Sequence, residues 1–340
     1  MKICLLTRSF NLKGGGIGRV SSELMKGLIK RGHSVHTIST NKESLPSYFK
    51  YTFLDMPFRI PKGFDIYHAV TSPMESIWIP KDKGVVTILD IIPVTNPEMH
   101  GARMGGNKVK YTVGKICFTV GCKQAARCKR VVCISEHTKQ ELIKHFGVEE
   151  SRVKVIRLGI RDDLRPLNKR NGKFRIGYLG QLDKRKRLDL LINAFKESSL
   201  DAELVIGGRG YDEAYFKVLA GLDSRIKFPG FVKDDELVDF YNSLDVFVFP
   251  TAIEGYGLPP VEAMACRKPV IVLNDAIIPW EVKSRCVIVE DLEFVLGSKS
   301  CLEGLLKSID YDGNYRFAKE HSWDKCIDEY IELYKEVLGK

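Results

Sequence analysis

Short apolar runs alternate with amphipathic segments along the first half of the chain. Residues 3–7 form an apolar run, a glycine-rich segment and a helical repeat follow, and residues 35–40 alternate as a second strand. Apolar runs of four to eight residues are typical of buried strands, and strands that alternate with helices indicate a parallel sheet. This half is therefore predicted to be a doubly wound α/β domain. Its further strands are expected at residues 65–70, 84–89, 130–135 and 153–158.

The same alternation starts again after a polar segment. Residues 164–172 contain R-P-L-N-K-R-N-G, and this mixture of proline, glycine and charge is typical of a linker. The pattern predicts an N-terminal domain over residues 1–165 and a second α/β domain over residues 172–321, with a last helix from about residue 322. The strands of the second domain are expected at residues 174–179, 202–206, 244–249, 269–273 and 287–289.

One segment of the second domain combines a strand, a glycine-rich turn and a helix. It reads P-T-A-I-E-G-Y-G-L-P-P-V-E-A-M-A over residues 250–265, and its two adjacent prolines suit the first positions of a helix. The N–H groups of Gly257 and Leu258 would be free near that helix start, where a phosphate can bind. Glu254 and Glu262 could then hold the hydroxyls of a nucleotide sugar. On spacing alone, Glu262 could equally complement the helix dipole and Glu254 be a solvated loop acid.

A second glycine-rich segment, N-L-K-G-G-G-I-G-R, precedes the first helix. Its glycines do not spell G-x-G-x-x-G and stand too far from the strand for a dinucleotide site. We expect Gly15 and Gly16 to let the backbone approach a phosphate or sugar at the helix N-terminus, with a surface loop as the alternative.

Composition narrows the class of protein. The chain has 340 residues, 44% of them hydrophobic, which is ordinary for a globular protein. We expect no signal peptide and no membrane span, because no apolar run is long enough. The nine cysteines have no regular spacing, so reduced thiols of a cytoplasmic protein are expected rather than disulfides or a metal site.

The charge is strongly uneven along the sequence. The net charge is +10, but residues 1–165 hold 28 Lys+Arg against 14 Asp+Glu, so the rest is mildly acidic. A basic first half indicates an anionic partner, either a nucleic acid or an anionic membrane surface. The basic residues are not interleaved with the aromatic residues that single-strand binders use, which argues against nucleic acid.

Much of this charge lies in residues 99–130, which contain no Asp or Glu. Within that segment Val109, Val113, Ile116 and Val120 recur at helical spacing and form an apolar stripe. A basic amphipathic helix can lie on an anionic membrane surface. A helix packed in the core, with a solvated basic face, explains the same pattern.

The string around Glu254 and Glu262 resembles retaining glycosyltransferases of family 4, which have the GT-B fold. Their pattern is a glutamate pair eight residues apart, often written E-G-F/Y-G-L-P-P-x-E-A-M-A, and the match here is nearly complete. The resemblance implies two Rossmann-like domains that face each other across a cleft. It also implies that the last helix, residues 322–340, packs back on the first domain. The form with E-G-Y-G-L-P-P-V-E favours a mannosyl transferase.

Other positions follow the family pattern less closely. Asp90 matches an acid that the family often places after a histidine, but that histidine is Leu89 here. Lys186 matches the lysine of G-R-L-x-x-x-K, whereas the arginine of that motif is Gln181, so Arg185 is expected to replace it. The segment around Phe231 resembles the loop that contacts the base.

The resemblance implies sugar transfer from a nucleotide-diphosphate sugar to a glycan or lipid-linked acceptor, without a metal or cofactor. Glu254, Lys186, Arg185 and Asp90 are then the expected catalytic residues. Substrate binding is expected at Gly15, Gly16, Gly257, Leu258, Glu262 and Phe231. Two alternatives remain: another GT-B enzyme, such as a nucleotide-sugar epimerase, and a non-enzymatic nucleic-acid-binding protein.

Overall fold

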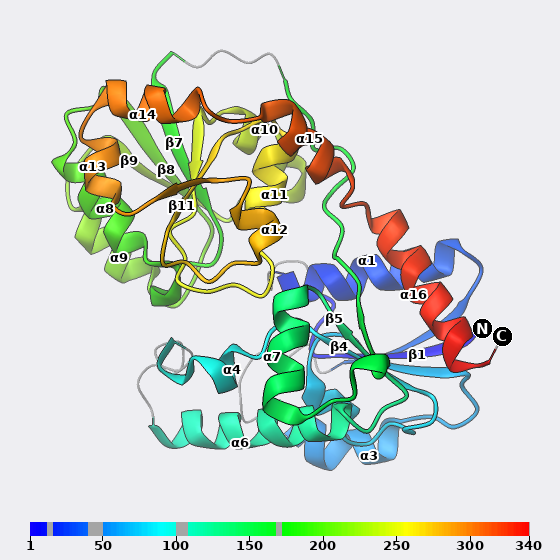
Figure 1. Ribbon diagram of the computed structural model, residues 1–340. Coiled ribbons are helices and arrows are strands. Elements are labelled where there is room, and N and C mark those ends of the chain that lie inside the picture. Colours follow the sequence, from blue (N-terminus) through cyan, green and yellow to red (C-terminus); the bar gives the residue numbers. More distant parts are fainter. Residues whose placement is uncertain (12–15, 40–49, 100–107, 168–171, 340) are drawn as a thin grey trace. The chain divides into compact units, whose positions relative to one another are not determined.

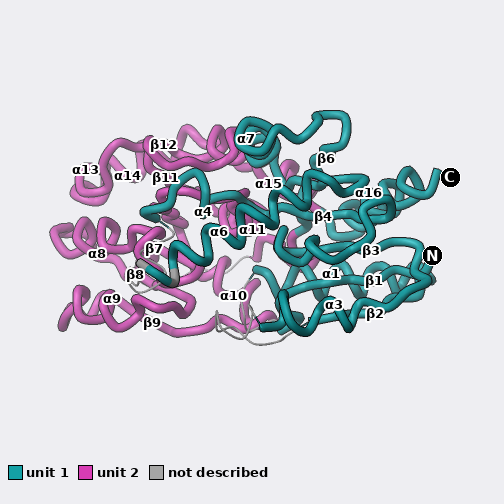
Figure 2. The backbone as a smooth tube through the Cα atoms, turned by 90° about the horizontal axis from the view of Figure 1, so that it is seen from below, with its two compact units in different colours: residues 1–159, 322–340 teal, residues 160–321 magenta. Residues whose placement is uncertain are grey.

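The computed structural model describes residues 1–11, 16–39, 50–99, 108–167 and 172–339. Its backbone divides into two compact units, one formed by residues 1–159 with 322–340 and the other by residues 160–321 (Figure 2). The division lies between Gly159 and Ile160, shortly before the predicted linker at residues 164–172. Residues 168–171 of that linker lie outside the described part.

Unit 1 is built on a parallel sheet with strand order β2-β1-β3-β4-β5-β6 within the described residues. Helices α1 and α16 cover one face of the sheet, and α3 and α6 the other (Figure 1). The strands are β1 (Lys2–Thr7), β2 (Ser34–Ser39), β3 (Ile66–Ala69), β4 (Gly84–Ile88), β5 (Arg130–Cys133) and β6 (Val153–Val155). The helices are α1 (Gly16–Lys30), η2 (Tyr51–Asp55), α3 (Met56–Arg59), η3 (Pro73–Ser76), α4 (Ile92–Thr95), α6 (Lys108–Ala125), α7 (Glu136–Phe146), η4 (Glu150–Arg152) and α16 (Trp323–Val337).

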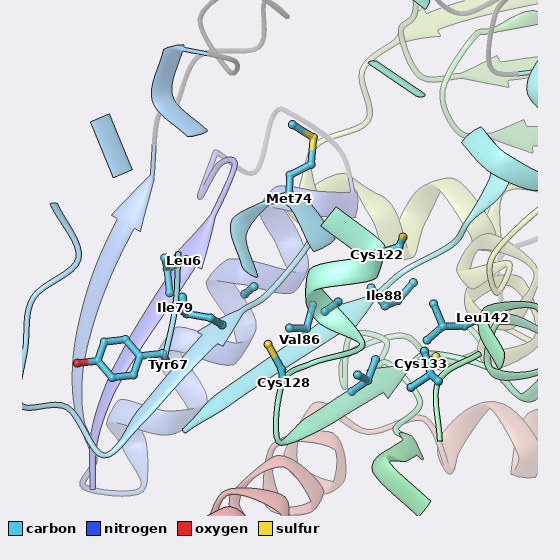
Figure 3. Packing of buried hydrophobic residues seen from close by; sticks show 14 of the residues in the cluster. Leu6, Tyr67, Met74, Ile79, Val86, Ile88, Cys122, Cys128, Cys133 and Leu142 are labelled. Atoms are coloured by element: carbon cyan, nitrogen blue, oxygen red, sulfur yellow. The ribbon is translucent and has the colours of Figure 1, made fainter. Parts of the chain in front are cut away.

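The strands β1, β3, β4 and β5 of unit 1 are buried on both faces, because helices cover both sides of the sheet and successive side chains point to opposite sides. On β3, Tyr67 and Ala69 join an apolar cluster with Cys122 of α6 and Cys128, which follows that helix (Figure 3). His68 lies between them in sequence and contacts α16 on the other face. This alternation explains the near-continuous apolar runs of the sequence.

The cysteines predicted to be reduced thiols are unpaired, and several pack in the apolar core. Cys122, Cys128 and Cys133 are fully buried in the cluster of Figure 3. Burial raises the pKa of Cys128 to about 11 and that of Cys133 to about 12, so both thiols are neutral. Among the described residues, no group of three or more His, Cys, Asp or Glu side chains is arranged to hold a metal ion.

Helix α16 is held on unit 1 by a buried polar network. The two ring nitrogens of His68 lie 2.7 Å from the Tyr334 hydroxyl and 2.8 Å from Thr87 Oγ1, and Thr87 Oγ1 lies 2.9 Å from the Tyr330 hydroxyl. Burial lowers the pKa of His68 to about 3, so the ring is neutral, with one nitrogen donating and the other accepting. At the rim, Arg31, which follows the last residue of α1, forms ion pairs with Asp324 and Asp328. The last helix therefore packs with the sheet of the first domain.

Unit 2 is built on a second parallel sheet, with strand order β12-β11-β10-β7-β8-β9 within the described residues. Helices α8, α9 and α13 cover one face and α10, α11 and α15 the other (Figure 1). The strands are β7 (Phe174–Leu179), β8 (Ala202–Gly207), β9 (Ile226–Gly230), β10 (Val246–Val248), β11 (Val270–Leu273) and β12 (Val287–Val289). The helices are η5 (Lys184–Lys186), α8 (Leu188–Glu197), α9 (Glu213–Ala220), η6 (Asp234–Glu236), α10 (Leu237–Asn242), α11 (Leu258–Ala265), α12 (Trp280–Lys283), α13 (Leu292–Leu296), α14 (Lys299–Leu306) and α15 (Tyr311–Lys319).

The predicted fold class, two doubly wound parallel-sheet domains, is confirmed by these two sheets. One segment differs, because residues 226–230 form the strand β9 where the sequence indicated a loop. Pro229 is compatible with a strand here since β9 lies at the edge of the sheet, where one side of the backbone has no strand partner.

The network around His68 gives a stability prediction. Tyr334→Phe removes the hydroxyl but keeps the ring, so one buried imidazole nitrogen loses its partner. Such a loss costs about 1–3 kcal/mol, and we expect the free energy of unfolding in urea to fall by that amount. Tyr211→Phe is the control, because Tyr211 is 69% exposed, and it should unfold like the wild type. A Tyr334→Phe variant as stable as the wild type would show that the network does not stabilise unit 1.

Candidate active site

The segment with the two glutamates forms a strand, a turn and a helix, as predicted. Strand β10 ends at Val248, a turn follows, and α11 begins at Leu258 with proline in its first positions. Gly257 caps this helix with a φ of 99°, which favours glycine because a side chain would clash with the backbone. The start of α11 therefore follows the carboxyl end of β10 after one turn segment.

The basic run after β7 lies beside this segment, because β7 and β10 are neighbours in the sheet. These two strands stand where the strand order reverses: β8 and β9 extend to one side, and β11 and β12 to the other. In doubly wound sheets, ligands bind outside the carboxyl ends of the strands at such a point.

Two cations of the basic run converge on one carboxylate. Lys186 Nζ donates to Glu254 Oε1, and Arg185 Nη1 lies 3.1 Å from the same oxygen. Thr251 donates its hydroxyl to that oxygen as well, at 2.8 Å. Lys186 is only 6% exposed, so this part of the run is not a solvated face.

The charges of this cluster depend on one another. Burial alone would raise the pKa of Glu254, but the charges of Arg185 and Lys186 and two hydrogen bonds lower it to about 2. The pKa of Lys186 is lowered, first by burial and then by Arg185, while Glu254 opposes the shift. Glu254 is therefore ionised at neutral pH and is the charge that offsets the repulsion between the two cations.

A second carboxylate, for which the sequence pattern carries no signal, belongs to the cluster. Asp183 is 1% exposed, and within the described residues neither of its oxygens accepts a hydrogen bond. Its nearest cation is Arg185, whose Nη2 lies 3.9 Å away. The cluster thus contains two cations and two carboxylates from two loops.

Glu262 lies in α11 and is 6% exposed. The hydroxyl of Tyr241, on α10, donates to Glu262 Oε2 at 2.7 Å. Tyr241 is fully buried, and its position in an apolar helical pattern gave no signal of this contact. Phe231 follows the edge strand β9 and is 36% exposed. The expected substrate-binding residues of the second domain therefore all follow carboxyl ends of strands in one sheet.

The remaining expected residues belong to unit 1. Asp90 follows β4, and its Oδ1 accepts a hydrogen bond from the N–H of Ile92 at 3.1 Å, a contact that caps the turn after the strand. Gly16 is the first residue of α1, whereas Gly15 lies outside the described residues. Gly18, one turn into α1, is required by packing, since a Cβ there would lie 1.9 Å from the carbonyl oxygen of Asn11.

Comparisons with known proteins decide the family. The family profile "Glycosyl transferases group 1" matches residues 160–285, and "Glycosyltransferase Family 4" matches residues 110–164. The chain belongs to the family 4 glycosyltransferases. The O-antigen chain mannosyltransferase B of Escherichia coli is 24% identical to this glycosyltransferase, over 98% of the chain and 100% of the relative.

Solved structures share the fold of this glycosyltransferase. The Anabaena protein HepE, in complex with UDP and glucose, has a TM-score of 0.71 at 18% identity, covering 99% of this chain and 100% of its own. WaaG, a glycosyltransferase involved in lipopolysaccharide biosynthesis, has a TM-score of 0.72 at 15% identity, with the same coverage. The architecture is therefore GT-B.

The pKa of Glu254 leads to a prediction about stability. Glu254→Gln removes the carboxylate that both buried cations share, so we expect the free energy of unfolding at pH 7 to fall by on the order of 3 kcal/mol. A carboxyl with a lowered pKa stabilises the folded state above its unfolded value of 4.5, and this contribution is lost as the pH falls toward 2. The difference between wild type and variant should therefore narrow below pH 4.5 in urea titrations.

The matched control for this measurement is Asp201→Asn. The side chain of Asp201 is 87% exposed and forms only a surface ion pair with Lys173, so its loss should change little at any pH. A stability difference for Glu254→Gln that is constant from pH 7 to pH 3 would contradict the ionised, cation-bound state of Glu254.

Proposed function

We propose that this glycosyltransferase moves a sugar from a nucleotide-diphosphate sugar to a glycan or lipid-linked acceptor, with retention of configuration. The observation that carries the proposal is the convergence of Arg185 and Lys186 on Glu254 at the reversal point of the unit 2 sheet. Two cations beside a helix start suit a diphosphate.

The cluster can exchange partners when the donor binds. In this structure Glu254 is the shared partner of both cations. A diphosphate offers more anionic oxygens than one carboxylate, so it would compete for Arg185 and Lys186 and leave Glu254 to accept hydrogen bonds from sugar hydroxyls. As the bond to the sugar breaks, negative charge grows on the leaving diphosphate, and the two fixed cations stabilise it.

The other residues then divide between nucleoside and acceptor. Glu262, held by Tyr241, would accept hydrogen bonds from the ribose hydroxyls, and Phe231 would contact the base. Gly16 and Asp90 belong to unit 1, to which we assign the acceptor. The transferred sugar is proposed to be mannose, because the similar proteins include mannosyltransferases of Escherichia coli. Neither a metal nor a carboxylate nucleophile is assigned.

An exposed stripe on α6 suggests where the acceptor comes from. Val109, Val113, Ile116 and Val120 are 73%, 40%, 57% and 40% exposed, so the alternative of a core-packed helix is wrong for these residues. The buried side of α6 is different: a Cβ on Gly121 would lie 2.7 Å from the N atom of Met74 in η3, so the helix packs closely there.

Basic residues stand on the same helix and just after it. Lys123, Arg127 and Lys129 are exposed at the end of α6 and just after it, and Lys115 is half-buried within the helix. Each Lys or Arg near an anionic membrane contributes about 1 kcal/mol of attraction. None of the described helices is apolar over a length that would cross a membrane. We therefore propose a cytoplasmic enzyme that attaches peripherally to the inner face of a membrane and acts on a lipid-linked sugar.

The donor site is tested by nucleotide binding. Thermal-shift screening with UDP, GDP and their sugars first identifies the nucleotide, since a bound ligand raises stability. Calorimetry then compares variants: Lys186→Ala should weaken the nucleoside diphosphate roughly tenfold or more, and the free nucleoside much less, because the lysine acts on phosphate charge. Lys184→Ala is the matched control, since Lys184 is the exposed neighbour in the same run. Equal losses for diphosphate and nucleoside would refute the role of Lys186.

The membrane is tested by sedimentation with liposomes. Wild-type protein should pellet with vesicles rich in anionic lipid, and less protein should pellet as salt increases. Replacing Lys108, Lys115 and Lys123 by Glu should abolish pelleting without lowering the melting temperature. Val113→Gln combined with Ile116→Gln should reduce it, because apolar area is lost from the interface.

The control lies on unit 2, where α9 and its flanks expose a similar stripe. Val218 and Leu222 are 80% and 103% exposed, but Glu213 and Asp223 lie near them in sequence. Val218→Gln with Leu222→Gln should leave pelleting unchanged. If wild-type protein stays in the supernatant at low salt with strongly anionic vesicles, the acceptor is better sought among soluble molecules.

A further inference from the structure

Arg187, the last residue of the basic run, has an unusual backbone. Its φ is 49° and its ψ 40°, and it stands between η5 and α8. Among the described residues other than glycine, a positive φ occurs only at Arg187 and Arg267. Glycine adopts this left-handed conformation at lower cost, because a Cβ crowds the neighbouring carbonyl oxygen. We therefore expect contacts of the arginine side chain to compensate for the cost of this backbone conformation.

The guanidinium of Arg187 bonds two loops at once. Its Nε donates to the carbonyl oxygen of Pro250 at 2.9 Å, and its Nη2 to that of Thr251 at 3.0 Å. On the other side, Nη1 and Nη2 bond the two carboxylate oxygens of Asp275 at 2.6 and 2.9 Å. Arg187 thus joins the loop after β7, the loop after β10 and the loop after β11.

The two carbonyls belong to the segment that carries Glu254. The N–H of Ala252 in this segment donates to the backbone carbonyl oxygen of Arg185 at 2.9 Å. The N–H of Glu254 donates to the backbone carbonyl oxygen of Ile277, also at 2.9 Å. The Thr251 hydroxyl donates to the Glu254 carboxylate. The backbone that presents Glu254 is therefore bonded on both sides, and Arg187 holds its beginning.

We propose that Arg187 is a positioning residue, which fixes residues 250–254 so that Glu254 meets Lys186 and Arg185. Only an arginine among the cationic side chains has a planar fork of five donors that bonds two carbonyls and a carboxylate together. Asp275 is 70% exposed, so its ion pair adds little, and the two carbonyl contacts fix the loop. The strained backbone is then retained because glycine would supply none of these donors.

Hydrogen exchange followed by mass spectrometry tests the positioning directly, and it needs no substrate. Arg187→Gly removes the donors while relieving the backbone, so the melting temperature should change little. Exchange at the amides of residues 251–256 should become roughly tenfold faster, as expected when bonds that hold a segment are lost. Arg187→Lys keeps the charge but not the fork and should be intermediate.

Arg267→Gly is the matched control, because it relieves the same backbone conformation at a position paired with Asp312. It should leave exchange at residues 251–256 as in the wild type. If Arg187→Gly exchanges there like the wild type or like Arg267→Gly, the positioning role is refuted.

A second experiment measures turnover of the variants with GDP-mannose and UDP-glucose as donors, and it rests on the proposed function. If Arg187 acts through Glu254, the Arg187→Gly/Glu254→Gln double variant should turn over no more slowly than Glu254→Gln alone. If the double variant instead loses turnover by the product of the two single-variant losses, Arg187 does not act through Glu254. If the wild type consumes neither donor, the proposed donor chemistry fails, while the exchange measurement still decides whether Arg187 holds the segment.

Discussion

The pairing of the buried, ionised Glu254 with two cations fixes the arrangement of three loops in unit 2. Glu254 is 14% exposed, and its partner Lys186 stands in a loop 68 residues earlier in the chain. An ionised carboxylate in such a place is costly unless cations and hydrogen bonds surround it. Arg185, Lys186 and Thr251 supply them, so the loops after β7 and β10 keep a fixed relation. Arg187 extends the same relation to the loop after β11.

The order of the strands makes this meeting possible. β7 is the first strand of unit 2, and it has a neighbour on each side. The chain first adds β8 and β9 on one side of β7 and then returns to add β10, β11 and β12 on the other side. The same arrangement recurs in unit 1, where β1 lies between β2 and β3. There Thr7 at the end of β1 contacts Thr71 just beyond β3, with 3.0 Å between the hydroxyl oxygens. Each unit therefore brings polar groups together at its reversal point.

Much of the fold and part of the site could be predicted from the sequence. The apolar runs located the strands, and the double proline after Gly257 located the start of α11, because these signals depend on local backbone rules. The match around Glu254 and Glu262 indicated the family. The strand β9 was missed, since a proline and a glycine in five residues obscure an edge strand.

The contacts between distant segments could not be predicted. Nothing in the helical pattern of residues 237–242 shows that Tyr241 bonds Glu262 across the unit. Four successive basic residues are normally solvated, and only the packing of two loops shows that Lys186 is buried and that Arg187 bonds backbone carbonyls. His68 was likewise indistinguishable from any other buried histidine until α16, more than 250 residues later, supplied its partner.

The central claim is that the carboxyl edge of the unit 2 sheet binds the nucleotide of the donor. A crystal structure with bound GDP or UDP tests it most directly. The account predicts the diphosphate within hydrogen-bond distance of Lys186 and Arg185, the ribose hydroxyls on Glu262, and Glu254 released from at least one cation. A nucleotide bound in unit 1, beside the glycines that precede α1, with the Glu254 cluster unchanged, would contradict it.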